Sequence, residues 1–66
     1  MNDEIHKALT PLEVYDVLRS AHSLVKDCLY AKNFEQMSSD LQNAIESVSG
    51  VLYLAEGVAV KEDNSN

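Results

Sequence analysis

Residues 34–58 read FEQMSSDLQNAIESVSGVLYLAEGV, and their apolar side chains recur at alternating spacings of three and four residues. Residues three and four apart lie on the same side of an α-helix, so this spacing indicates a helix with one continuous apolar seam. The repeat extends over about three heptads. It therefore predicts a helix over residues 34–58 whose seam is Phe34, Met37, Leu41, Ala44, Val48, Val51, Ala55 and Val58, flanked by Ile45, Leu52 and Ala59.

A first helix is predicted over residues 11–32. Thr10 is a good N-cap, Pro11 occupies the first helical position, where its missing N–H costs nothing, and Glu13 completes a Thr-x-x-Glu capping box. No alternation of period two continues for more than four residues, which argues against strands. The apolar stripe of this helix consists of Val14, Val17, Leu18, Ala21, Leu24, Val25, Cys28 and Ala31.

The connection leaves the start of the second helix open. Asn33 with Gln36 is one candidate capping box and Ser39 with Gln42 is another, so the second helix begins at residue 34 or at residue 39. Neither choice changes the seam. Two helices of similar length that are joined by a short turn are expected to pack antiparallel.

The chain has 66 residues and no covalent brace, since its one cysteine, Cys28, excludes an intrachain disulfide. Chains of this size usually need a disulfide, a metal or a partner subunit to be stable. We therefore predict an all-α fold, an antiparallel two-helix hairpin that dimerises into a four-helix bundle. We expect residues 1–9 to form a flexible arm and residues 61–66 a disordered tail, with Gly57 as a signal for the end of the second helix.

Both seams contribute to the predicted core and dimer interface. Because one stripe on each helix suffices for the contact within the hairpin, the surplus apolar group of Tyr15, Leu29, Leu52 and Leu54 is assigned to the contact between two copies. The sequence leaves open whether the hairpins pair parallel or antiparallel. The residues assigned to the core and dimer interface are Val14, Leu18, Ala21, Val25, Cys28, Leu41, Ala44, Val48, Val51, Leu52 and Ala55.

The charge of the chain disfavours several classes of partner. Eleven Asp and Glu stand against five Lys and Arg, a net charge of -6, whereas nucleic acids and anionic membranes attract basic proteins. We recognise no signal peptide and no apolar run near the ~20 residues that span a bilayer. A single free thiol fits a reducing compartment, so we expect a cytoplasmic protein without nucleic-acid or membrane partners.

The reactive side chains are too scattered to predict catalysis. His22 and Cys28 are six residues apart, a spacing that does not place two metal ligands on one helical face. We expect Cys28 to pack as a small hydrophobic residue and His22 to lie at the surface or in an interface. The sequence contains no Gly-rich phosphate loop and no recognisable Ser-His-Asp arrangement. The prediction is no enzyme, no cofactor, and no catalytic, cofactor-binding or metal-binding residue.

A negative surface is predicted along the second helix, because no Lys or Arg occurs from residue 33 to residue 60. A solvated surface explains this charge most simply, and a docking surface for a basic protein is the alternative. Tyrosine provides a large contact area at low entropic cost. The candidate partner-binding residues are Tyr30, Glu46, Tyr53 and Glu56.

These patterns carry two resemblances. The arrangement resembles the plasmid repressor-of-primer family, in which two helical hairpins pair into a four-helix bundle that binds paired RNA loops. This acidic chain lacks the basic and polar positions of that family's RNA-binding face. Residues 52–60, LYLAEGVAV, which follow the run from residue 41 to residue 51, are similar to the second helix of short uncharacterised helical-hairpin proteins of bacterial chromosomes and prophages. This second likeness covers residues 12–60 and implies a small phage-derived regulator that binds a host protein.

The leading hypothesis is a small, non-enzymatic regulatory or inhibitory module that binds a second copy of itself and a host or cellular protein. One alternative is a nucleic-acid-binding regulator of the repressor-of-primer type. A structural subunit of a larger assembly is the other.

Overall fold

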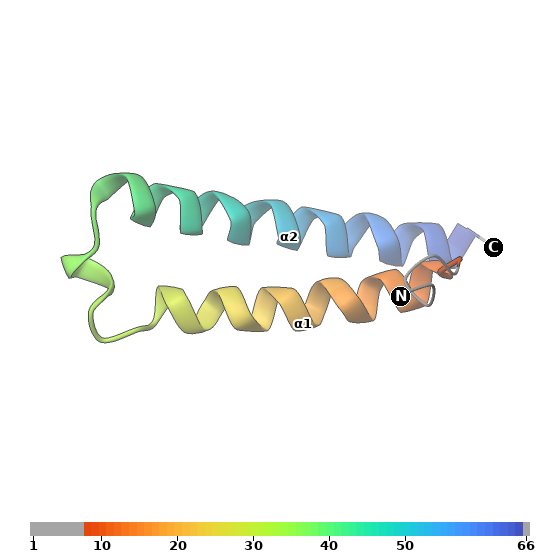
Figure 1. Ribbon diagram of the computed structural model, residues 1–66. Coiled ribbons are helices and arrows are strands. Elements are labelled where there is room, and N and C mark those ends of the chain that lie inside the picture. The colour runs from red at the N-terminus through yellow and green to blue at the C-terminus, as the bar shows by residue number, and fades with distance from the viewer. Residues whose placement is uncertain (1–7, 66) are drawn as a thin grey trace.

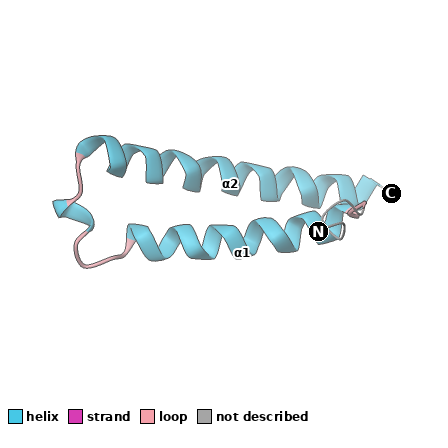
Figure 2. Cartoon of the chain, in the orientation of Figure 1, coloured by secondary structure: helices cyan, strands magenta, loops and turns pink. Residues whose placement is uncertain are grey.

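The computed structural model describes residues 8–65, which form a hairpin of two antiparallel helices (Figure 1). Helix α1 spans Pro11–Leu29, a 3₁₀ helix η2 spans Phe34–Gln36, and helix α2 spans Ser39–Ser65. No strand occurs in this part of the chain (Figure 2). The predicted all-α hairpin is confirmed. Most of the predicted arm, residues 1–7, lies outside the described residues.

Helix α1 begins as the capping box predicts. The Glu13 N–H donates to Thr10 Oγ1 at 3.1 Å, and the Thr10 N–H donates to Glu13 Oε1 at 3.0 Å. The helix ends at Leu29, before the predicted residue 32. There the Tyr30 N–H still bonds to the Lys26 carbonyl four residues back, whereas the Ala31 N–H bonds to the Cys28 carbonyl three residues back. The tighter turn directs the chain out of the helix.

The connection selects the later of the two starts for the second helix. Ser38 caps α2, since its hydroxyl accepts from the Leu41 N–H at 3.2 Å, and Ser39 is the first helical residue. Asn33 makes no capping bond with its side chain. The Gln42 side chain instead donates to the carbonyl oxygens of Phe34 and Met37, both at 3.0 Å. These two bonds attach the 3₁₀ turn to the first turn of α2.

Helix α2 runs on to Ser65, so two expectations about its end were wrong. Residues 61–65, predicted as part of a disordered tail, are helical, and Gly57 lies inside the helix. A glycine ends a helix when it adopts the left-handed conformation, and neither Gly50 nor Gly57 does so. Ala59, two residues beyond Gly57, is buried with 5% exposure, and this packing holds the last turns of α2 beside α1.

Helix α2 faces α1 with a side different from the predicted one. The predicted seam residues Leu41, Val48, Val51 and Val58 are 49%, 47%, 64% and 55% exposed. The contact with α1 uses the stripe one position later, a rotation of about 100° around the helix. This inner stripe consists of Gln42, Ile45, Ser49, Leu52, Glu56 and Ala59, all buried or half-buried. Assigning the more apolar stripe to the inside of the hairpin was therefore wrong.

The exposure of the α1 side chains also differs from the prediction. Tyr15 and Leu29, predicted to contact a second copy, are half-buried within the hairpin, as are the predicted core residues Val14, Leu18, Ala21 and Val25. Val17 and Leu24 are instead 58% and 68% exposed. Cys28, predicted to pack as a core residue, is exposed as well. Over the described residues only Ala59 and His22 are buried, so a single hairpin has almost no core.

Candidate functional site

One broad face of the hairpin presents exposed apolar side chains from both helices. In an antiparallel pair, positions rotated by about 100° in the same sense from the contact line lie on the same face. We call this surface the apolar face. It consists of Val17, Leu24 and Cys28 of α1 and Leu41, Ala44, Val48, Val51 and Val58 of α2, with the half-buried Val14, Ala21 and Ala55 along its midline.

The apolar face carries no charge along its middle. Carboxylates lie only at its borders. On α1, Glu13 and Asp27 flank Val17 and Leu24 at helical spacings of four and three residues, and on α2, Asp40 and Glu62 lie at the two ends. From Leu41 to Val58 the face is about 26 Å long, and two helices make it roughly 20 Å wide. Its projected area is therefore roughly 500 Å², at the upper end of what a soluble monomer exposes as one apolar patch.

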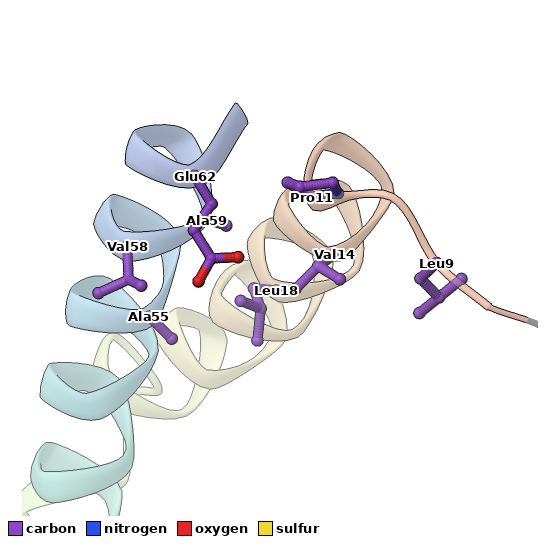
Figure 3. A pocket seen from close by; sticks show the side chains of 8 residues that line it. All are labelled: Leu9, Pro11, Val14, Leu18, Ala55, Val58, Ala59 and Glu62. Carbon is purple, nitrogen blue, oxygen red and sulfur yellow. The ribbon is translucent and has the colours of Figure 1, made fainter. Parts of the chain in front are cut away.

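At the open end of the hairpin the apolar face deepens into a groove of about 420 Å³ between the helices (Figure 3). Leu18 of α1 and Ala55 of α2 point into the space between the helices, and the Glu62 side chain extends over it. Because Val58 and Ala55 belong to both surfaces, the groove continues the apolar face. Its lining consists of Leu9, Pro11, Val14, Leu18, Ala55, Val58, Ala59 and Glu62.

The opposite face is organised around His22, which is 8% exposed. Its Nδ1 lies 2.8 Å from Glu56 Oε2, and its Nε2 lies 3.2 Å from Ser49 Oγ. A carboxylate can only accept, so Nδ1 carries the hydrogen and donates to Glu56, and in the neutral ring Nε2 accepts from the Ser49 hydroxyl. Both bonds cross from α1 to α2. They satisfy the buried imidazole and fix the rotation and register of one helix against the other.

The order hydroxyl, imidazole, carboxylate is that of a catalytic triad, and this cluster was not predicted from the sequence. Ser49 is 27 residues from His22 and Glu56 is 34, so only the hairpin brings them together. The signal available in the sequence was the seven-residue spacing of Ser49 and Glu56, which puts both on one side of α2 opposite a lone histidine. Two observations argue against acyl transfer. Ser49 does not line the groove into which His22 and Glu56 open, and the backbone N–H groups around it are bonded within the helix, so they cannot serve as oxyanion donors.

Beside His22 lies a second groove of about 470 Å³, which we call the polar groove. The Arg19 guanidinium lies over the Tyr15 ring, 5.9 Å from its centroid, and does not pair with Asp16 as its spacing would allow. The Tyr53 ring meets His22 edge to face, with centroids 6.4 Å apart and planes at 67°. The groove is lined by Tyr15, Arg19, His22, Ser23, Lys26, Tyr53 and Glu56.

The structure places the four candidate partner-binding residues as follows. Tyr53 and Glu56 line the polar groove, and the Tyr53 side chain is 70% exposed. Glu46 lies two turns before Tyr53 on the same side of α2, and Tyr30 ends α1 with 82% exposure. The Glu56 carboxylate is bonded to His22, so the predicted negative surface of α2 is interrupted at this point.

Within residues 8–65, no three His, Cys, Asp or Glu side chains gather closely enough to hold a metal ion. Neither α1 nor α2, as far as the chain is described, combines the length and the apolar character needed to cross a bilayer. Comparisons with protein-family models, with curated proteins and with solved structures found no match for this chain.

Proposed function

We propose that this protein is a homodimeric, non-enzymatic protein-binding module in which two hairpins bury their apolar faces against each other as a four-helix bundle. The observation that carries the proposal is the exposure of Val17, Leu24, Val48, Val51 and Val58 on one face of the hairpin. A second copy is the occupant that matches this face over its whole length, because a two-fold axis brings each apolar stripe against an equally apolar one.

The dimensions of the hairpin agree with this occupant. The chain is 17 Å across in its shortest dimension, little more than one layer of helices, whereas stable domains have at least two packed layers. Burying roughly 500 Å² on each copy gives about 1,000 Å² in total, the lower limit for a specific interface. At ~25 cal/mol per Å², that burial adds a hydrophobic contribution to the free energy of unfolding. A single hairpin gains little of it, because only His22 and Ala59 are buried there.

Charge favours placing the two loops at opposite ends of the bundle. Over the described residues, four carboxylates and one ammonium lie at the open end of the hairpin, a net charge of -3, from Glu13, Asp16, Lys61, Glu62 and Asp63. The loop end has a net charge of -1, from Lys26, Asp27, Lys32, Glu35 and Asp40. Opposite loops keep the two most negative ends apart, so we propose the antiparallel pairing of hairpins.

The same arrangement supports a binding role. With the apolar faces buried, the two polar grooves lie on the outer surfaces of the bundle, accessible to another protein. The Ser49–His22–Glu56 cluster acts in this proposal as an internal polar contact, and the protein regulates or inhibits its partner by occupying the partner's surface. The free thiol of Cys28 is consistent with a reducing compartment such as the cytoplasm.

Light scattering and sedimentation over a range of concentrations test the dimer directly. We expect a mass of twice 7.3 kDa at micromolar concentration, with helix content falling on dilution as the dimer dissociates. A compact, fully helical species of single-chain mass at every concentration would refute the dimer.

Cross-linking tests the pairing. In a Cys28→Ser background, Val51→Cys lies near the proposed two-fold axis and should link to its copy with a short bismaleimide. Leu41→Cys in the same background is the matched control, because its copies are about 30 Å apart when the loops are at opposite ends. Similar linking through positions 41 and 51 would show that the loops lie at the same end, because each residue would then be level with its copy along the bundle.

A further inference from the structure

We propose that the polar groove binds a carboxylate-rich segment of a partner protein through Arg19 and Lys26. The proposal deepens the protein-binding function proposed above by naming the chemistry of the partner. This partner differs in charge from the basic protein considered above as the alternative to a solvated surface.

The two cations of the groove are available to a ligand. Arg19 lies over the Tyr15 ring, and within residues 8–65 no carboxylate pairs with Arg19 or with Lys26. The nearby carboxylate, Glu56, is already bonded to His22. The groove therefore presents two positive charges against one internally bonded negative charge, although the whole chain is strongly acidic.

The spacing of the cations suits an extended peptide. Arg19 and Lys26 are seven residues apart on one side of α1, a separation of about 10.5 Å. In an extended, polyproline-like peptide, residues three apart point the same way and are about 9.3 Å apart. Two glutamates at positions i and i+3 of such a segment would each reach one cation.

The aromatic residues add contact area on the sides of the groove. The Arg19 guanidinium lies over the Tyr15 ring, and its planar group of N–H donors can form a two-bond contact with a carboxylate. Tyr53, which is 70% exposed, provides an aromatic surface and a hydroxyl that can donate to a carboxylate.

A protein segment fits this groove better than a nucleic acid does. A nucleic-acid-binding protein typically contacts about six to ten phosphates, whereas a groove with two cations could contact about two. A net charge of -6 on each chain opposes a long polyanion as well. A short segment with two carboxylates needs no more than Arg19 and Lys26 provide.

The test is titration of the ¹⁵N-labelled full-length protein with a capped peptide containing two glutamates three residues apart, followed by NMR. We expect saturable shifts at residues of the polar groove, and about tenfold weaker binding by Arg19→Gln/Lys26→Gln, since exposed ion pairs contribute ~2–5-fold each. Lys32→Gln, an exposed cation outside the groove, is the matched control and should bind as the wild type does. The same peptide with glutamine in place of both glutamates should not bind.

Light scattering of the double variant separates this proposal from the dimer. We expect it to remain dimeric, because Arg19 and Lys26 lie away from the apolar face. Binding that is equally strong in the double variant, no binding to the wild type, or a preference for a uridine-rich RNA oligonucleotide over the peptide would each overturn the acidic-segment proposal. A monomeric wild type that still binds the peptide through Arg19 and Lys26 would refute only the dimer.

Discussion

The two faces of the hairpin differ in how far one chain completes them. On the polar side, His22 finds both of its partners, Ser49 and Glu56, within the same chain. On the apolar face, Val51 and Leu24 remain about two-thirds exposed, and nothing in the described chain covers them. Polar groups must be paired when they are buried, so they fix the internal contact, whereas apolar groups only need to be removed from water, which a second molecule can do equally well.

The largest expected effect comes from a charge on the apolar face. Val48→Asp places two carboxylates, one from each copy, in the proposed interface without a partner, which costs several kcal/mol. We expect loss of the dimer and, because a single hairpin buries so little, loss of most helical circular dichroism at micromolar concentration. Asn43→Asp, an exposed change on another side of α2, is the control and should leave both unchanged. A Val48→Asp variant with wild-type mass and melting temperature would show that the apolar face is not the interface.

The polar face should respond differently. Glu56→Ala removes the acceptor from His22 Nδ1, and hydrogen bonds to charged groups contribute about 1.5–3 kcal/mol. We expect urea denaturation to show a loss of that size at fixed protein concentration, with the dimer retained. Glu46→Ala, which removes an exposed carboxylate from the same helix, should stay within about 0.5 kcal/mol of the wild type. If the two variants were equally stable, the His22–Glu56 contact would not hold the hairpin together.

These two faces also explain which parts of the fold the sequence could predict. The start of α1 was predictable, because Thr10, Pro11 and Glu13 act within one helical turn. The inner side of α2 was not. Its apolar stripe through Val48 and Val51 is more regular than the inner stripe, which contains Gln42, Ser49 and Glu56. The usual rule assigns the more apolar stripe to the core, and it fails where that stripe faces a second molecule instead.

The candidate site was hidden for a related reason. His22, Ser49 and Glu56 look unremarkable along the chain, since they are widely separated and none belongs to a recognisable motif. They form a cluster only when α2 is rotated so that Ser49 and Glu56 face α1, and the packing of the two helices sets that rotation. Arg19 and Lys26 were likewise visible as charges, but the groove that makes them a pair exists only between two packed helices.

A smaller effect is expected at Cys28, an exposed thiol of the apolar face. In the proposed dimer this face is covered, so alkylation by iodoacetamide should slow as the protein concentration rises, in proportion to the fraction of dimer. The urea-unfolded chain provides the reference rate for an accessible thiol. Mass spectrometry of quenched samples measures both rates. A rate independent of concentration across the dissociation range would place Cys28 outside the interface.

The smallest effect concerns Gly50, which lines neither groove and does not belong to the apolar face. Gly50 lies in the interior of the helix, and a Cβ added there would meet no atom within 4 Å. Alanine loses less backbone entropy than glycine in a helix, so Gly50→Ala should stabilise the protein by about 0.5–1 kcal/mol without changing its mass or its peptide binding. Thermal and urea unfolding at one protein concentration would measure the gain in stability. Ala44→Gly, on the apolar face, makes the opposite substitution and serves as the comparison. Destabilisation by Gly50→Ala would mean that another molecule packs against this side, and the assembly would then have to be larger than two hairpins.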